Sequence, residues 1–415
     1  MSMNERDGVE EDSSWADASL LVGLPAAVRA ALVLNVPKII DSVFPILALS
    51  AEEICKHVTE TQGRPASPQN LEKIMDYLCC NGIFSLTIEQ EEKDGGFFRV
   101  KKYSHSPKSR CLSRDQIVDS LLMFTAPEFV TLWSKAHEPV FNPQVSAFEL
   151  NTGKFFYKYL AEEAPELQQI YVRQLKGSST QALKLLIEQY DDEFNTLKGR
   201  VVDVGGQEGA ICTGLAAKYP HLNFINFDLP EVIRAAPRIS RVEHVGGSFF
   251  EVVPSGNLLI IKFCLLNWDD ESCLQILKNC RKALAHERSG KLLIIDRMDR
   301  SADTVTRDED VKARTASAFS NFFGTLVLSG ARTRTLEEFR GLALAAGFSA
   351  LEFVHNYPGF DLMEARADQA QEPFCRLAAY WGTMDARDEV FFWSNSKGSD
   401  HIAFRDRLDE QRIRL

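Results

Sequence analysis

A glycine-rich turn is the segment of this 415-residue chain whose residue types best suit nucleotide binding. It runs from Val201 to Gly209 with the sequence VVDVGGQEG, in which an apolar strand leads into a tight turn. Gly205 and Gly206 allow a ligand to approach the backbone closely, and Gly209 allows the following helix to pack near the strand. Asp228 ends the next apolar run, where a carboxylate can accept hydrogen bonds from both hydroxyls of a ribose. These residues predict a nucleotide site at the ends of two neighbouring strands.

The acid that precedes the glycines indicates which nucleotide is bound. The spacing Gly205-Gly206-x-x-Gly209 differs from the Gly-x-Gly-x-x-Gly of dinucleotide-binding enzymes. The carboxylate of Asp203 would repel a pyrophosphate on this turn, whereas it suits the ammonium of an amino-acid moiety. The pattern therefore favours S-adenosylmethionine, or its product S-adenosylhomocysteine, over NAD.

Composition excludes several other classes of partner. The net charge of −11 argues against nucleic acid, because no broad positive field is available to attract phosphates. The nine cysteines form no Cys-x-x-Cys pair and no cluster with histidine, so we expect no metal site and a reducing compartment. Residues 1–15 lack the basic start of a signal peptide, and no apolar run reaches the ~20 residues of a membrane span. We therefore expect a cytoplasmic protein with no membrane partner.

The segment 16–112 is expected to form a mainly helical, winged-helix-like dimerisation domain, preceded by a disordered stretch over 1–15. An almost continuously apolar run over 16–43 must be covered on every side, either by its own domain or by a partner subunit. A helix capped by Ser50 and a second helix after Ser67 lead into a predicted hairpin. Such a unit binds DNA in many proteins, but the charge balance here favours a dimerisation and lid module.

Strand-like and helix-like runs alternate over 197–364, which predicts an open, mainly parallel sheet covered by helices. The fold class is thus α/β, with a Rossmann-like domain following the helical one. Between them, 113–196 is typical of helices rich in aromatic residues, and we expect it to act as a linker and substrate lid. The polar C-terminal extension 365–415 has no predicted structure.

Six segments within 16–365, taken together and in order, resemble the plant and fungal small-molecule O-methyltransferases of the caffeate and flavonoid type. They are VVDVGGQEG, NFDLPEVI, VGGSFFEVVP, IIKFCLLNWDDESCLQILKNC, GKLLIIDRMD and RTLEEFRGLALAAGF. The resemblance implies a Rossmann-like methyltransferase that uses S-adenosylmethionine to methylate a small aromatic or secondary-metabolite acceptor. It also implies a homodimer in which the N-terminal domain helps to close the partner's pocket.

The resemblance also assigns contacts to the cofactor. By position, Gly205 and Asp228 hold its amino-acid and ribose parts, and Lys262 lies near its adenosyl group. Phe249 stands where the family has methionine against the adenine, and an aromatic ring can stack there equally well. Ser248 replaces an aspartate and can still form a hydrogen bond. The complete set of predicted cofactor contacts is Asp203, Gly205, Gly206, Gly209, Asp228, Leu229, Ser248, Phe249 and Lys262.

The chain departs from this family at the position of the catalytic base. The family has His-Asp-Trp or His-Asn-Trp after the lysine, and the histidine takes the proton from the phenol; here Leu266 replaces it. The two family glutamates that orient the histidine align with Asp296 and Thr333, of which only Asp296 is an acid. A phenol with a pKa of about 10 is ionised in about one molecule in a thousand at neutral pH. A positioned base contributes ~10²–10⁴ in rate, which leucine cannot supply.

Three functions are compatible with this departure. The first is methyl transfer, expected on oxygen with Asp296 or His137 as a substitute base, or onto an amine or acidic acceptor that needs none. Alternatively, Asp296 is a structural cap or an ion-pair partner of Arg297, and His137 is an exposed surface residue. The second is a non-methylating cyclase or pericyclase, in which a bound sulfonium serves as a fixed positive charge. The third is a catalytically silent relative whose dimer is the functional object.

The acceptor pocket is expected to be apolar and lined by aromatic side chains, although residues of these types belong more often to a core. Alignment and spacing place the following side chains near the acceptor: Met123, Phe124, Phe156, Tyr171, Leu175, Leu266 and Arg297.

Overall fold

The computed structural model describes residues 20–43, 48–93, 96–113, 115–284, 290–300 and 308–367. The stretch predicted to be disordered, 1–15, lies outside these residues, as does the extension beyond position 367. The extension begins inside the fold, because its first two residues belong to the last strand, Phe360–Arg366.

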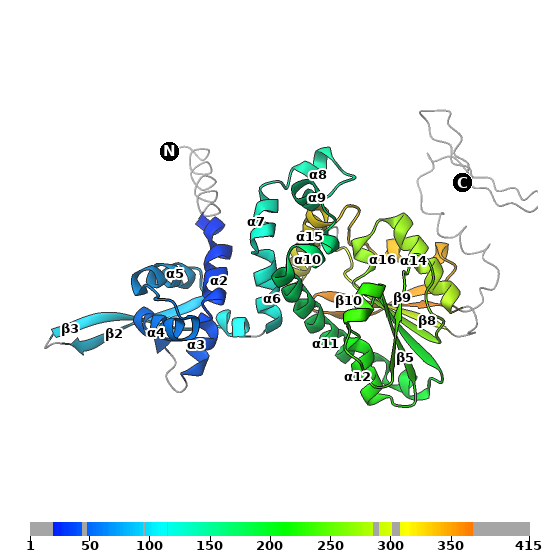
Figure 1. Cartoon of the computed structure of the whole chain (residues 1–415), viewed down its shortest axis with the longest axis horizontal. Coiled ribbons are helices and arrows are strands. Elements are labelled where there is room, and N and C mark those ends of the chain that lie inside the picture. The colour runs from blue at the N-terminus through cyan, green and yellow to red at the C-terminus, as the bar shows by residue number, and fades with distance from the viewer. Residues whose placement is uncertain are drawn as a thin grey trace, which may run out of the picture. The chain divides into compact units, whose positions relative to one another are not determined.

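The N-terminal region combines helices with a three-stranded antiparallel sheet of order β1-β3-β2, the helix-helix-hairpin arrangement that the sequence predicts (Figure 1). Ser50 caps α4 in a reciprocal capping box with Glu53. One face of α2 shares a core with α4 and α5, while Leu20, Leu21 and Val22 before it are exposed. The elements are η1 Leu21–Gly23, α2 Leu24–Val33, α3 Val36–Ser42, β1 Ala48–Leu49, α4 Ala51–Gln62, α5 Pro68–Cys80, β2 Phe84–Lys93 and β3 Gly96–His105.

Helices make up the middle of the chain, as predicted. The long helix α11 contains a non-helical residue, Tyr190, at a kink. It is tied to α6 by Arg173, whose guanidinium donates to both carboxylate oxygens of the buried Asp119. The elements are η2 Ser109–Ser113, α6 Asp115–Phe124, α7 Pro127–Trp133, α8 Glu138–Phe141, α9 Ala147–Thr152, α10 Phe156–Glu162 and α11 Pro165–Thr196.

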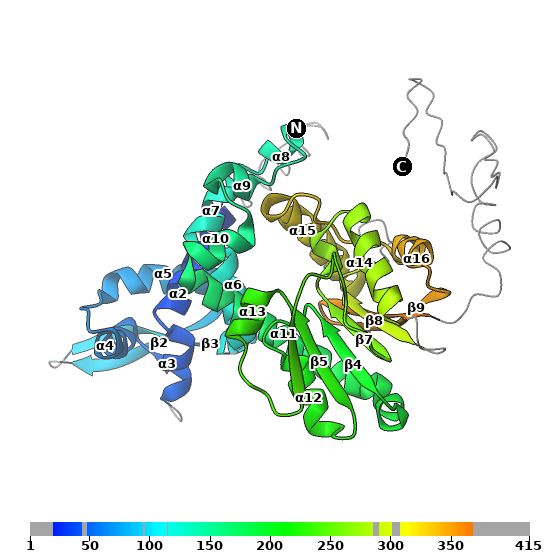
Figure 2. The same cartoon turned by 45° about the vertical axis from the view of Figure 1, so that its right-hand side comes forward.

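The C-terminal region is built on a seven-stranded sheet of order β6-β5-β4-β7-β8-β10-β9. The first five strands in this order run parallel, and β10 and β9 are antiparallel additions at one edge (Figure 2). The strands are β4 Arg200–Val204, β5 Asn223–Asp228, β6 Val242–Gly246, β7 Leu258–Lys262, β8 Lys291–Asp296, β9 Ala350–Tyr357 and β10 Phe360–Arg366. The helices are α12 Ala210–Lys218, α13 Pro230–Ala235, η3 Leu265–Asn267, α14 Asp270–Ala283, α15 Asp308–Val327 and α16 Leu336–Ala345.

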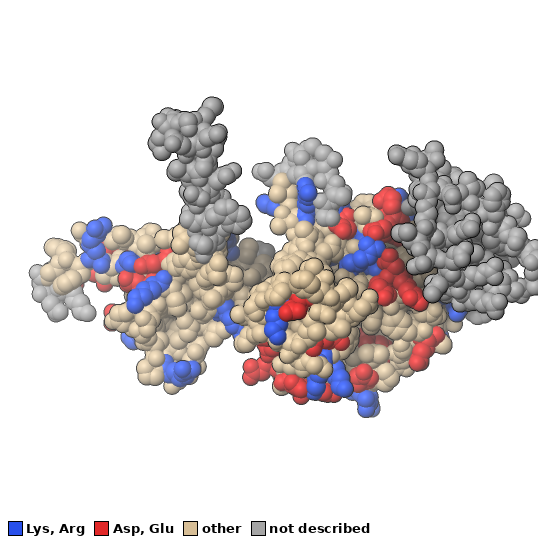
Figure 3. Space-filling model, turned by 90° about the horizontal axis from the view of Figure 1, so that it is seen from above, with Lys and Arg blue, Asp and Glu red and all other residues tan. Residues whose placement is uncertain are grey.

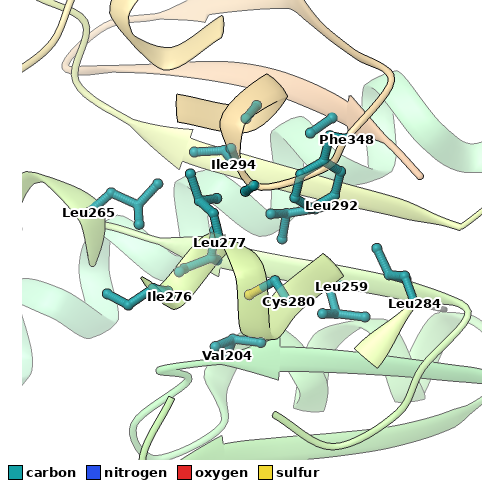
Figure 4. Packing of buried hydrophobic residues seen from close by; sticks show 14 of the residues in the cluster. Val204, Leu259, Leu265, Ile276, Leu277, Cys280, Leu284, Leu292, Ile294 and Phe348 are labelled. Carbon is teal, nitrogen blue, oxygen red and sulfur yellow. The ribbon is translucent and has the colours of Figure 1, made fainter. Parts of the chain in front are cut away.

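Alternating side chains of each strand enter two separate cores, one on each face of the sheet. On one face, Ile276, Leu277 and Cys280 of α14 pack over Val204, Leu259 and Ile294 (Figure 4). On the other face, α11 and α12 cover the sheet. The predicted Rossmann-like α/β fold is therefore confirmed.

The sheet order determines where a ligand can bind. Strand β4 pairs with β5 on one side and with β7 on the other, so the chain changes direction across the sheet at β4. In open α/β sheets, ligands bind beyond the carboxyl ends of the strands at this switch point. The glycine-rich turn follows β4 at that point.

The surface charge and the hydropathy of the helices can be described for the part of the chain that the structure covers. On the face seen in Figure 3, Lys and Arg are interspersed with Asp and Glu rather than gathered into one stripe. No single described helix has the length and apolar character to cross a membrane; only the pair Leu21–Val33 and Val36–Ser42 meets both criteria together, across a bend of 48°.

Candidate functional site

The turn after β4 uses backbone conformations that favour glycine. Gly205 and Gly209 have φ of +75° and +82°, and Gln207 between them has φ of +52°. A Cβ on Gly205 would lie 2.6 Å from the Cys264 sulfur, so only glycine fits there. The N–H of Gly205 donates to Phe227 O of β5 at 2.8 Å, which anchors the turn to the neighbouring strand. The turn is thus a tight, fixed support for a ligand.

Asp228 stabilises the strained part of this turn. A non-glycine residue in the left-handed region costs about 1–3 kcal/mol unless its surroundings compensate. The Gln207 N–H donates to Asp228 Oδ2 at 2.8 Å, and the Leu229 N–H donates to Oδ1 at 2.7 Å. Burial raises the pKa of Asp228, while these two N–H groups oppose that shift. Asp228 therefore lies at the predicted place and joins the turn to the end of β5.

Two buried oxygens below the turn test whether the predicted cofactor fits. Asp203 Oδ2 and Asn226 Oδ1 are buried without a hydrogen-bond partner among the residues that the structure describes, which is rare for such atoms. A Cβ on Gly206 would lie 2.6 Å from Asp203 Oδ2 and closer still to Asn226 Oδ1. Burial raises the pKa of Asp203 to about 7, and the positive charge of Lys262 opposes the shift. Electron-rich oxygens beneath a close-approach glycine fit a ligand with an ammonium group better than one with a pyrophosphate.

Asn226 is a site residue that the sequence analysis missed. It lies opposite Asp203 in the pairing of β4 with β5. Its Nδ2 donates to Gln207 O at 2.7 Å, and the same atom lies 3.0 Å from His244 Nδ1 on β6. The sequence did contain a signal for Asn226. Side chains alternate between the two faces of a strand, and Asn226 lies two residues before Asp228, so both side chains lie on the same face of β5.

Lys262 links the sheet to the helical segment. Its Nζ donates to Ser178 Oγ of α11 at 3.1 Å and lies 4.6 Å from the centroid of the Phe263 ring. Burial lowers the pKa of Lys262. Ser178 was not predicted, because a polar residue inside a helix gives no sequence signal for a tertiary contact.

The remaining predicted cofactor residues lie near the same strand ends. The loop after β6 carries Ser248, whose Oγ accepts a hydrogen bond from the Phe250 N–H at 3.3 Å. Phe249 meets Trp268 edge-on with ring centroids 6.3 Å apart, and its ring edge would lie 3.9 Å from a Cβ on Gly205. Leu229 is exposed directly after Asp228.

The short turn η3 carries Leu266 and is held from both sides. The Leu266 N–H donates to Asp296 Oδ2 at 3.1 Å, and the Arg297 N–H donates to Asp296 Oδ1 at 2.8 Å. Burial raises the pKa of Asp296 to about 6. The fully buried Arg334, another residue that the sequence analysis missed, donates to Leu265 O at 3.0 Å and Trp268 O at 2.7 Å. Both carboxylate oxygens of Asp296 thus accept backbone hydrogen bonds, one of them from this turn.

The other two residues considered for the base region have different surroundings. His137 precedes α8, with a side chain that is 65% exposed and 3.5 Å from Glu138. Thr333 donates from Oγ1 to Asn321 Oδ1 at 2.8 Å. Neither contact involves the turn of Leu266, so the structure gives His137 the surface position that was its alternative interpretation.

Most of the predicted acceptor residues belong to or contact one buried, largely aromatic cluster. Phe124 meets Phe323 of α15 edge-on with centroids 4.8 Å apart, and Met123 beside it is buried. Phe156 and Tyr171 have centroids 5.8 Å apart. Burial raises the pKa of Tyr171 to about 12, and a hydrogen bond with Tyr157 opposes this shift. Leu175 lies one turn further along α11 and is half-buried.

Comparison with known proteins identifies the family. The model of the O-methyltransferase domain family matches residues 133–349. "O-methyltransferase 12" of Lophophora williamsii is 32% identical over 350 residues, which cover 83% of this chain and 86% of that protein. The chain belongs to the O-methyltransferase family. S-adenosylmethionine is therefore its cofactor, as the glycine turn and Asp203 predict.

The relatives of this methyltransferase include proteins named for methylation of nitrogen as well as of oxygen. "Anthranilate N-methyltransferase" of Ruta graveolens is 32% identical over 364 residues, which cover 87% of this chain and 94% of that protein. The crystal structure of human N-acetylserotonin methyltransferase in complex with S-adenosylmethionine matches with a TM-score of 0.67 at 17% identity. The match covers 89% of this chain and 100% of the human chain, and it supports the Rossmann-like fold. Among the described residues of this methyltransferase, no group of three or more His, Cys, Asp or Glu could hold a metal ion.

Proposed function

We propose that this methyltransferase acts on a small aromatic acceptor whose nucleophilic atom already carries a free lone pair at neutral pH. Such an atom is a neutral amine nitrogen or an oxygen that ionises unaided. When bound, the cofactor supplies a methyl group made electrophilic by its sulfonium. The proposal rests on Leu266, which stands where the family has its proton acceptor.

None of the described residues considered as a replacement for that base has surroundings that favour proton uptake from a substrate. Asp296 accepts two backbone hydrogen bonds, and a carboxylate used in this way has little freedom to approach a substrate. Burial raises the pKa of Tyr171 to about 12 and also raises that of Tyr157, so both hydroxyls favour hydrogen-bond donation over proton uptake. His137 has an exposed side chain. Asp296 and His137 as bases therefore remain predictions that these contacts do not favour.

Methyl transfer to an amine or to an ionised oxygen can proceed in a site without a protein base. The lone pair forms the new bond to the methyl carbon while the carbon–sulfur bond breaks, and S-adenosylhomocysteine leaves. An amine loses its proton to water after the transfer, so no protein base is needed during bond formation. Relatives named for methylation of nitrogen as well as oxygen are in keeping with this range.

The test is transfer of label from methyl-labelled S-adenosylmethionine to aromatic amines, acidic phenols and ordinary phenols of similar size. We expect label in the first two groups and little in the third. Leu266→His should raise methylation of ordinary phenols by about 10²-fold, the contribution of a positioned base, whereas Leu266→Asn, a polar control without a base, should not. Efficient methylation of ordinary phenols by the unmodified protein would contradict the proposal. Conversion of a substrate without label would favour a non-methylating reaction instead.

A further inference from the structure

The guanidinium of Arg297 lies at the end of β8 among neutral partners. Its Nε donates to Gly359 O at 3.1 Å and its Nη1 donates to Ser320 Oγ of α15 at 2.9 Å. The ring of Phe263 lies beneath it, with 5.5 Å between the ring centroid and Cζ. None of these partners neutralises the positive charge.

Arg297 is also without a close acid. In the part of the chain that the structure describes, no carboxylate oxygen lies within 4.0 Å of its side-chain nitrogens. The adjacent Asp296 raises the pKa of Arg297 through space but has both oxygens bound to backbone N–H groups, and burial lowers that pKa overall. By contrast, Arg300 three residues later pairs with Asp361 at 2.6 Å. The Arg297 side chain is half-buried, so its positive charge is only partly solvated and is stabilised when an anion binds it.

A second cation shares the same aromatic ring. Lys262 Nζ lies 4.6 Å from the Phe263 centroid, and the positive charge of Arg297 contributes to the lowered pKa of Lys262. Among the described residues Lys262 has no ion pair within 4.0 Å either, and its Nζ donates a hydrogen bond to the neutral Ser178. The ends of β7 and β8 therefore present two positive side chains around Phe263.

The position of Arg297 connects it to the acceptor region. Ser320, which holds the guanidinium, lies one helical turn from Phe323 on the same face of α15. Phe323 contacts Phe124, a predicted acceptor residue, with ring centroids 4.8 Å apart. On its other side, Arg297 follows Asp296, which fixes the turn of Leu266. Arg297 is thus linked through Ser320 to the helix that carries part of the aromatic cluster, and through its place in the chain to the carboxylate that holds the turn of Leu266.

From this arrangement we infer that Arg297 binds a carboxylate of the acceptor and that the preferred substrates are small aromatic carboxylic acids. The inference rests on the proposed function, because it names the substrate class of the same site. A guanidinium offers a planar fork that matches a carboxylate in geometry and charge, while an aromatic ring attached to that carboxylate would pack on the Phe124 side. The recognised carboxylate need not be the group that is methylated.

The experiment compares acids with their uncharged amides. We would measure binding of the three aminobenzoates and the three aminobenzamides to the protein saturated with S-adenosylhomocysteine, by calorimetry, and then label transfer at steady state. For at least one isomer the acid should bind ten or more times more tightly than its amide. In Arg297→Gln the KM and Kd of that acid should rise at least tenfold, with kcat and amide binding nearly unchanged. Arg297→Lys should retain part of the preference because it keeps the charge.

A matched control is Arg281→Gln, since the Arg281 Nε also donates to a backbone carbonyl, that of Gly347 at 2.8 Å, in the last turn of α14. It should leave both ligand series unchanged, and S-adenosylhomocysteine affinity in all variants reports an intact cofactor site. Equal affinity for acids and amides, or equal weakening of both in Arg297→Gln, would overturn the inference. Arg297-dependent binding of acids without label transfer supports it and counts against the proposed function. Label transfer to amines without a preference for acids supports the proposed function and counts against the inference about Arg297.

Discussion

The two turns that face the site differ in how their polar groups are used. The glycine turn after β4 contains strained backbone at Gln207 and lies over two buried oxygens that lack partners. The turn Leu265–Asn267 after β7 is bonded on both sides, by the carboxylate of Asp296 and the guanidinium of Arg334. The first turn retains polar capacity that a ligand can use. The second uses its polar neighbours to hold its shape, and the Leu266 side chain that it carries has no basic atom.

Loss of Arg334 should break the second turn and have the largest effect. Arg334→Met removes the donors to the buried carbonyls of Leu265 and Trp268, each of which costs about 1–3 kcal/mol when left unpaired. We expect the free energy of unfolding in urea to fall by about 2–5 kcal/mol. The control is Arg332→Met, which removes a half-exposed arginine that also pairs with Asp270 and should cost under about 1 kcal/mol. Equal losses in the two variants would refute a special role for the buried arginine.

Crowding the first turn should affect the cofactor and spare the second turn. In Gly206→Ala the new Cβ meets Asp203 Oδ2 at 2.6 Å and also meets Asn226, both buried, so the turn must shift. We expect the Kd for S-adenosylhomocysteine to rise by about 10- to 100-fold, or about 1.4–2.7 kcal/mol, measured by calorimetry. Gly341→Ala on α16 is the control, because a Cβ there meets nothing within 4 Å. Unchanged affinity in Gly206→Ala would mean that the turn does not contact the cofactor.

Asp203 below the first turn and Asp296 beside the second should affect the free energy of unfolding over different pH ranges. Both have a pKa raised by burial, Asp203 to about 7 and Asp296 to about 6, so the folded protein retains protons that the unfolded chain has lost. Each acid therefore makes stability fall as pH rises from about 4, by at most about 1.4 kcal/mol per pH unit, until its own folded pKa is passed. In urea unfolding without cofactor, Asp203→Asn should remove the part of this slope that extends to about pH 7. Asp296→Asn should change the slope only below about pH 6, and identical profiles for both variants would contradict the assignment.

The sequence was most informative where a residue type is itself the constraint. Gly205 and Gly209 have the positive φ values that only glycine adopts without strain, and the cofactor prediction drawn from them was confirmed. The alternation of apolar runs was sufficient for the α/β fold, because burial on both faces of a parallel sheet requires it. Leu266 was informative for the same reason, since no neighbour can give an alkyl side chain a basic atom.

Contacts across the fold could not be derived in that way. Arg334 is a charged residue that sequence reasoning places on the surface, yet it is fully buried because its donors match the carbonyls of a turn that lies distant in the chain. Asn226 and Asp203 became neighbours only through the pairing of β4 with β5. His137 is the opposite of Arg334. Its imidazole could act as a base, but its side chain is exposed on the surface.

The sequence by itself thus determined the fold class and the cofactor, and it predicts the loss of the family's base, since each depends on what single residues can or cannot do. Only the tertiary structure decided that Asp296 is engaged by two backbone N–H groups while Arg297, its neighbour, is left without a close acid. Side chains of successive residues in a strand point to opposite faces. The partners of each therefore depend on which elements pack against those faces, and not on the local sequence.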